Sequence, residues 1–207
     1  MGRVLFFFGL LVSLQSLTAQ KLVKKTLLKD NISKIQIDVG NCFEIDLATS
    51  DSQELIIEAQ IDGEYKKDLL LNVTEQGSTI GISAAFQPNF INPNDKLSAH
   101  KVISIALKVL LPEHKTVHVF GTHCNVSATG VYELLNISLN DGRCDLVGVS
   151  ENVEVVTQSG PISAFYEKAK VTAKSKYGKI IGPDSNSGNG QYDLRTVTGN
   201  ILLKRVE

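Results

Sequence analysis

The chain has 207 residues, and its 21 Lys and Arg against 22 Asp and Glu give a formal net charge of −1. This length supports one domain with a substantial core, and the lack of a basic excess excludes the electrostatic footprint of a nucleic-acid-binding protein. Tryptophan is absent and aromatic residues make up 6% of the chain, which argues against a carbohydrate cleft built from aromatic platforms.

The first nineteen residues have the pattern of a targeting segment. Arg3 is followed by the mostly apolar stretch 4–17, and Ala19 offers a small residue at a cleavage point. About fourteen apolar residues are too few for a comfortable membrane span of roughly 20, so an uncleaved anchor is the weaker alternative. We expect residues 1–19 to be a signal peptide. The mature chain would then be exported, with no membrane span, to the periplasm, the cell surface or the medium.

The N-terminal half predicts β-strands and no convincing helix. The segment 22–28 fits a helix, a strand or a loose arm. Alternating apolar residues in 35–39 and 43–47, with Gly40-Asn41 between them, predict a hairpin. Further strands are predicted at 55–61, 69–74, 79–85 and 102–111, and a surface loop at 86–100. We expect antiparallel strands over 33–111.

The C-terminal half contains a repeat. Its copies begin at intervals of 18, 18, 18 and 21 residues, at Val117, Leu135, Val153, Val171 and Tyr192. Apolar and polar residues alternate within each copy, which is typical of a strand with one buried face. Such a fixed period predicts a solenoid. The three extra residues of the last interval fall among the turn formers of 182–191 and predict a surface loop there.

Each copy also contains a turn and a second strand. Seven residues after the copy begins, four of the five copies have a glycine, which predicts a turn that needs positive φ. These glycines are Gly142, Gly160, Gly178 and Gly199, and Cys124 replaces glycine in the first copy. An apolar residue returns two positions later. The predicted fold is therefore all-β, with residues 33–111 leading into a parallel β-solenoid of about five rungs at 112–206, within a single domain 20–207.

Two features together resemble a known family. They are the Ile-x-Ile-x-Val/Phe-x-Ile-x-Leu pattern near residue 35 and the repeat, clearest in Val153–Ser163 and Tyr192–Leu202, with Val109-Leu110-Leu111-Pro112 leading into it. This pattern resembles the bacterial putative adhesin family that includes DUF4097 and its adhesin head-domain relatives, over residues 33–206. The resemblance implies an exported β-helix-like binding protein, and it implies no catalytic residues.

The sequence shows no constellation typical of an enzyme. The candidate acids fall in different columns of the repeat: Asp141, Asp145, Glu154, Glu167 and Asp193. The four histidines show no zinc-binding spacing. The run 184–190 partly matches a calcium loop but has Arg195 where the twelfth-position acid belongs. We expect no catalytic residue, metal or cofactor.

Three cysteines cannot all pair within one exported chain. Cys144 falls in an apolar column, which favours a buried free thiol. A bridge between Cys42 and Cys124 stays open, because their spacing neither supports nor excludes it.

A few apolar residues fall on the outward face of the copies and form a candidate binding face. They are Phe120, Val156 and Val197 in one column, and Val147 and Phe165 in another. The function we expect is a non-enzymatic, adhesin-like binding module of the bacterial envelope, whose partner is a surface protein or a glycan. The alternatives are a periplasmic structural or envelope-sensing component and a carbohydrate-active enzyme acting through Asp141 and Asp145. A homo-oligomer stays open.

Overall fold

The computed structural model describes residues 20–63, 66–89, 103–183 and 185–206, so the expected signal peptide lies outside the described residues. This part of the chain is all-β apart from one 3₁₀ turn at Lys66–Asp68. Its sixteen strands are β1 (Gln20–Leu27), β2 (Lys34–Asp38), β3 (Glu44–Ser50), β4 (Glu54–Gly63), β5 (Leu69–Gln76), β6 (Thr79–Phe86), β7 (Ile103–Pro112), β8 (Thr116–His123), β9 (Asn125–Asp141), β10 (Cys144–Thr157), β11 (Ile162–Tyr166), β12 (Ala169–Ser175), β13 (Ile180–Ile181), β14 (Ser185–Asn186), β15 (Gly190–Thr196) and β16 (Ile201–Arg205).

Within the described ranges there is no helix with the length and apolar character that crossing a membrane requires.

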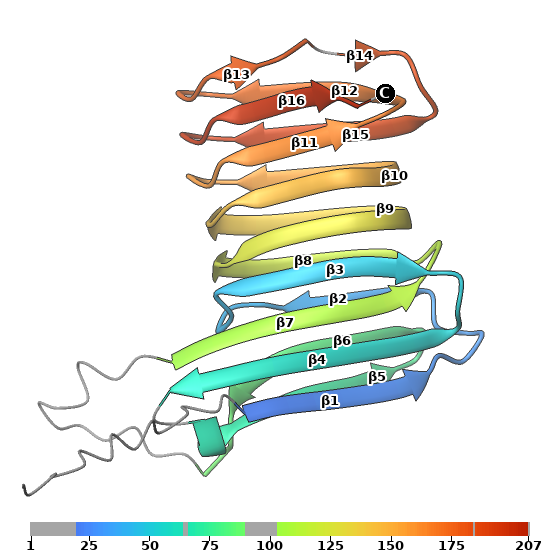
Figure 1. The fold of residues 1–207 in the computed structure, drawn as a ribbon, viewed down its shortest axis with the longest axis vertical. Coiled ribbons are helices and arrows are strands. Elements are labelled where there is room, and N and C mark those ends of the chain that lie inside the picture. The colour runs from blue at the N-terminus through green and yellow to red at the C-terminus, as the bar shows by residue number, and fades with distance from the viewer. Residues whose placement is uncertain (1–19, 64–65, 90–102, 184, 207) are drawn as a thin grey trace, which may run out of the picture.

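The strands form two layers that follow the long axis of the molecule (Figure 1). The first layer has the order β1-β4-β7-β3-β9-β10-β11-β16-β13, and the second runs β5-β6-β2-β8-β9-β10-β15-β12-β14. β9 and β10 belong to both layers, because each of these long strands pairs in one layer with its first half and in the other with its second half. The pairs are a mixture of parallel and antiparallel.

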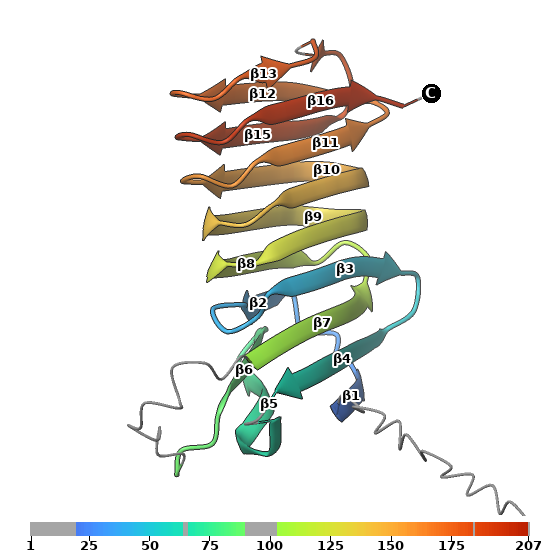
Figure 2. The ribbon, with the colours of Figure 1, turned by 60° about the vertical axis from the view of Figure 1, so that its left-hand side comes forward.

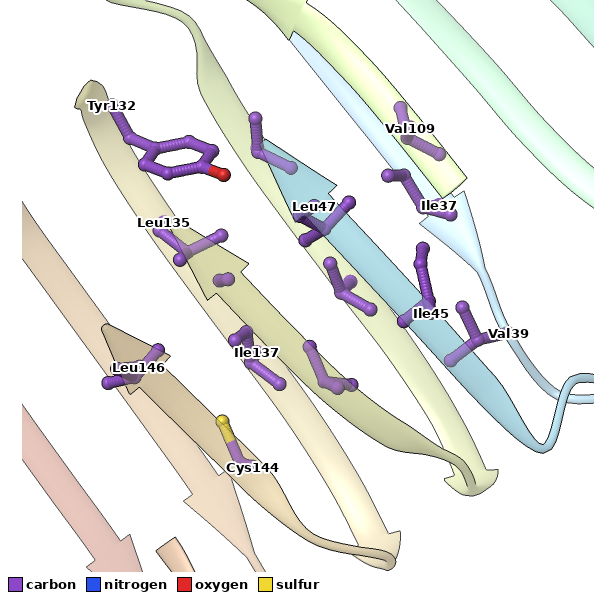
Figure 3. Packing of buried hydrophobic residues seen from close by; sticks show 14 of the residues in the cluster. Ile37, Val39, Ile45, Leu47, Val109, Tyr132, Leu135, Ile137, Cys144 and Leu146 are labelled. Carbon is purple, nitrogen blue, oxygen red and sulfur yellow. The ribbon is translucent and has the colours of Figure 1, made fainter. Parts of the chain in front are cut away.

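The hydrophobic core lies between the two layers, and the repeat supplies it in columns. The copies align in parallel register, so that their first residues, Val117, Leu135, Val153, Tyr192 and Val171, are neighbours in that order and all are buried. Parallel neighbours lie about 4.8 Å apart, so each apolar column becomes continuous. Figure 3 shows Leu135 and Ile137 of one layer with Cys144 and Leu146 of the other in this core.

The last copy lies inside the stack and not at its end. β15 pairs with β10 on one side and β12 on the other, and β16 lies in the same way between β11 and β13 (Figures 1 and 2). The fifth copy is therefore inserted between the third and the fourth. Although β16 is the last strand in the sequence, it is therefore not an unpaired edge strand. The outer strands at this end are β13 and β12, and β14 covers the beginning of β12 in antiparallel register.

The predicted hairpin of 35–39 and 43–47 is also wrong. β2 and β3 do not pair with each other, because the chain crosses from one layer to the other between them. β2 pairs in parallel with β6 and β8, and β3 pairs in parallel with β7 and β9. Ile35 lies beside Val117 and Ile45 beside Val126. The segment β2–β3 is thus a further copy of the repeat arrangement, which alternation alone could not distinguish from a hairpin.

The antiparallel pairs of the N-terminal half are β1–β4, β4–β7 and β5–β6. The ambiguous segment 22–28 forms most of β1, and the strands predicted at 55–61, 69–74 and 79–85 are confirmed as β4, β5 and β6. The strand predicted at 102–111 is β7. Most of the loop predicted at 86–100 lies outside the described residues.

Candidate functional site

The four predicted turn glycines lie at one side of the stack, where the chain crosses between the layers. An added Cβ at Gly160 would come within 3.0 Å of the carbonyl oxygen of Gly142, and one at Gly199 would do the same to Gly160. Gly178 approaches Gly199 in the same manner. The physical reason for glycine is therefore the close approach of stacked turns. The expected positive φ occurs only at Gly142, at 103°.

In three of these turns, a Thr or Ser three residues before the glycine makes a hydrogen bond to the backbone of the turn. The Thr157 hydroxyl donates to the Gly160 carbonyl oxygen at 2.7 Å and is buried. The Gly199 N–H donates to the Thr196 hydroxyl at 3.1 Å, and the Gly178 N–H donates to the Ser175 hydroxyl at 2.9 Å. Polar backbone groups in the turns thus find partners inside the stack, as buried polar groups require.

The five residues of the predicted binding face lie in two different layers. Phe120 and Val156 share one outward column, separated by Ser138. The prediction that Val197 belongs to this column is wrong, because the neighbour of Val156 in the fifth copy is Arg195. Val147 and Phe165 are direct neighbours, but they lie on the first halves of the copies, in the other layer. Val156 and Val197 line a shallow depression of about 370 Å³. These residues therefore do not meet in one surface.

A larger cleft, of about 650 Å³, lies at the opposite ends of the strands from the glycine turns. Its walls are three crossings between the layers, at 148–152, 166–169 and 188–190, and Tyr192 contributes to its lining. The cleft occurs where the fifth copy enters the stack. Gly188, with a φ of 135°, packs so closely on the backbone of Lys168 and Ala169 that a side chain would not fit.

The lining of the cleft is mostly polar. Its lining residues include the charged Glu151, Glu167 and Lys168 and the polar Ser150, Asn152 and Asn189. Glu151 has an unusual φ of 72°, and its carboxylate lies 3.1 Å from His114 Nδ1. Non-glycine residues adopt such a φ rarely, and backbone strain of this kind concentrates at functional sites.

Two buried tyrosines stiffen the floor of the cleft. The ring centroids of Tyr166 and Tyr192 lie 6.1 Å apart, and the Tyr192 hydroxyl donates to the carbonyl oxygen of Val149. The Tyr166 hydroxyl donates to the carbonyl oxygen of Pro183 at 3.3 Å. Burial raises the pKa of Tyr192, so this hydroxyl stays protonated and acts as a donor. The floor is therefore formed before any ligand arrives.

None of the predicted binding-face residues lines this cleft. Glu167, one of the candidate acids, does. The signal that could have located the site was the longer last interval with its glycine-rich run 182–191, since loops inserted in repeats gather on the functional face. Asp184 of that run lies outside the described residues.

The candidate acids are engaged at the surface. The prediction that they fall in different columns is wrong for Glu154 and Asp193, which are direct neighbours because the fifth copy stacks on the third. Glu154 accepts a hydrogen bond from Asn136 at 2.8 Å, and Asp193 accepts from Arg195. Asp145 lies 2.6 Å from Arg143 Nε. Neither Glu154 nor Asp193 lines the cleft.

No group of three or more His, Cys, Asp or Glu within the described ranges is placed to hold a metal ion.

All three cysteines are buried free thiols. Cys42 and Cys124 occupy matching turns of two stacked copies, and burial, with a smaller contribution from nearby acidic groups, raises the pKa of each to about 12. Burial raises the pKa of Cys144 as well. The disulfide between Cys42 and Cys124 that the spacing left open is not formed in this structure.

Comparison with known proteins shows similarity of fold. No family model and no curated protein matches the chain. A solved putative cell adhesion protein from Clostridium sporogenes aligns with a TM-score of 0.60 and 13% identity, over 90% of this chain and 100% of that one. Putative adhesins from Bacteroides fragilis and Parabacteroides merdae cover 90% and 91% of this chain and 97% of their own, with TM-scores of 0.31 and identities of 14% and 13%. Only the first alignment supports an argument, and it establishes the fold alone.

Proposed function

We propose that this chain is an exported, non-enzymatic binding module of a bacterial cell envelope, in which a five-copy β-solenoid carries an adhesin-like binding site. The observation that carries the proposal is the cleft of about 650 Å³ formed by 148–152, 166–169 and 188–190. Sites for small ligands have volumes of this order. The fold shared with a putative cell adhesion protein is consistent with a binding role.

A glycan is the ligand that fits this cleft best. Asn152, Glu167, Lys168 and Asn189 offer both donors and acceptors to a hydroxyl-rich molecule. A protein partner would require a contiguous surface of about 800 Å². The apolar residues of the predicted binding face do not supply one, because they are divided between the two layers.

A glycan array and then calorimetry test this proposal. The chain from Gln20 on contains every described strand and is the form to use. We expect the double change Glu167→Gln and Asn189→Ala to weaken glycan binding about tenfold or more, since hydrogen bonds to charged groups are worth roughly 1.5–3 kcal/mol. Asn140→Ala, an exposed asparagine at the opposite ends of the strands, is the matched control. A glycan affinity that is the same for the cleft variant and the wild type would contradict the proposal.

The absence of catalysis has its own test. Glu154 and Asp193 are neighbours on adjacent strands, and glycoside hydrolysis uses a pair of carboxylates. Each of the two is engaged by a neighbouring side chain and lies outside the cleft. We expect no release of reducing sugar from a panel of polysaccharides. Release that Glu154→Gln abolishes would replace the binding role by an enzymatic one.

Export to the surface is tested on intact cells. We expect added protease to cleave the chain without opening of the outer membrane. Protection until that membrane is opened would favour the periplasmic structural or sensing role.

A further inference from the structure

The end of the stack formed by the fourth copy exposes a group of apolar side chains, which we call the C-terminal tip. It comprises Tyr177, Ile180, Ile181 and Leu202. Tyr177 is 70% exposed, Ile181 53% and Ile180 42%. Ile180 is the last member of the column that runs through Ile162 and Ile201, both of which are buried. Its exposure means that the core of the molecule reaches the surface at this end.

Lysines lie within and beside the tip. Lys176 and Lys179 are next to Tyr177 and Ile180 in the chain, and Lys204 lies two residues beyond Leu202. In the described part of the chain none of these three lysines lies within ion-pair distance of a carboxylate. The Lys176 ammonium lies 5.0 Å from the centre of the Tyr177 ring. Of the acids described near this end, Asp193 is paired with Arg195 and Glu167 belongs to the cleft. Positive charge at the tip is therefore not neutralised by these neighbours.

We propose that the C-terminal tip docks onto the surface of a bilayer containing anionic phospholipid. An exposed tyrosine and two isoleucines on a tight turn are suited to entering the boundary between headgroups and acyl chains. Lysines beside them place their ammonium groups among the phosphates while their aliphatic stems lie along the apolar surface. Apolar and cationic side chains are thus combined as a membrane surface requires.

A second copy of the chain fits the tip less well. End-to-end stacking would bring the tip against the far end of another molecule, where the outer strands are β1 and β5. β13 provides only two residues for pairing with an added strand, and lysines at sheet edges oppose such pairing.

Sedimentation with lipid vesicles tests the proposal, again with the chain from Gln20 on, because the apolar stretch 4–17 would itself bind lipid. We expect the protein to pellet with vesicles of phosphatidylcholine and phosphatidylglycerol, but not with phosphatidylcholine alone, and to be released by 1 M salt, where charges about 3 Å apart are already screened. Lys176→Gln with Lys179→Gln should weaken binding about fivefold for each lysine removed.

The apolar part of the tip is tested separately. Tyr177→Ser with Ile181→Ser should weaken vesicle binding about tenfold or more, because insertion of the apolar side chains is lost. The controls are matched changes at the other end of the molecule: Lys24→Gln with Lys67→Gln for charge, and Leu27→Ser with Leu70→Ser for apolar exposure. Circular dichroism confirms that each variant is folded.

Three results would overturn the proposal. They are no pelleting with phosphatidylglycerol vesicles, tip variants that bind as well as the wild type, and a preference for soluble dextran sulfate that the apolar variant leaves unchanged. The last result would identify a polyanion as the partner. The tip and the cleft share no residue that these experiments change, so failure of one proposal leaves the other standing.

Discussion

Replacement of Gly160 by alanine tests whether close stacking of the turns is what requires glycine. The added Cβ would approach the Gly142 backbone within 3.0 Å at its carbonyl oxygen, at 3.0 Å from its carbonyl carbon and at 3.3 Å from its nitrogen. The Gly142 backbone belongs to a neighbouring copy that is hydrogen-bonded in the stack, so it can move away from the added Cβ only if the two copies separate. Overpacking of this kind costs typically 1–3 kcal/mol, and we expect about 3 kcal/mol for Gly160→Ala.

The matched control is Gly148→Ala. Gly148 has a φ of 58°, but an added Cβ there meets nothing within 4 Å. The left-handed conformation alone should cost about 1 kcal/mol. For a chain of this size each kcal/mol lowers Tm by about 2–4 °C, so we expect decreases of about 6–12 °C for Gly160→Ala and 2–4 °C for Gly148→Ala, followed by circular dichroism. An unchanged Tm for Gly160→Ala, or a larger loss for Gly148→Ala, would refute the steric argument.

Three further predictions concern the buried polar groups. Thr157→Val removes the donor to the Gly160 carbonyl oxygen and should lower the free energy of unfolding, measured in urea, by about 1–2 kcal/mol. Thr198→Val, at an exposed site, should change it by less than about 0.5 kcal/mol. Equal losses in the two variants would contradict this prediction. Because the pKa of Cys42 and Cys124 is about 12, these thiols should not react with an aromatic disulfide reagent at neutral pH in the folded protein. After unfolding, all three cysteines of the chain should react. A single reactive thiol in the unfolded protein would reveal a disulfide. Since unfolded thiols lose their protons at lower pH than the buried ones, stability should fall as pH rises from 9.0 towards 12, and a steeper fall in Cys42→Ala with Cys124→Ala than in the wild type would contradict this.

The sequence pattern predicted the local strands well, because alternation reports which side of a strand is buried. Val117, Leu135 and Val153 therefore fall in one buried column, as their spacing predicted. The alternation of apolar and polar residues does not indicate which strand pairs with which. The turn between Ile37 and Ile45 reads like a hairpin loop, yet the strands on either side of it belong to different layers.

Stacking order was likewise hidden from the sequence. A period places residues in columns without saying which copy neighbours which, so the adjacency of Val153 and Tyr192 could not be derived. The cleft follows from that adjacency. Its lining residues, such as Glu151 and Asn189, come from crossings between the layers with no common motif, and only the three-residue excess of the last interval marked the place.

The insertion of the fifth copy between the third and the fourth limits how this protein can evolve. The parallel neighbours of β12 and β13 come only from the fifth copy, so the two C-terminal copies form one interlocked unit. Duplication of a copy at the C-terminus would not simply lengthen the stack, because a new copy would find no free place beside the one that precedes it. Growth or shortening is open instead among the copies of β8, β9 and β10, which follow one another in chain order.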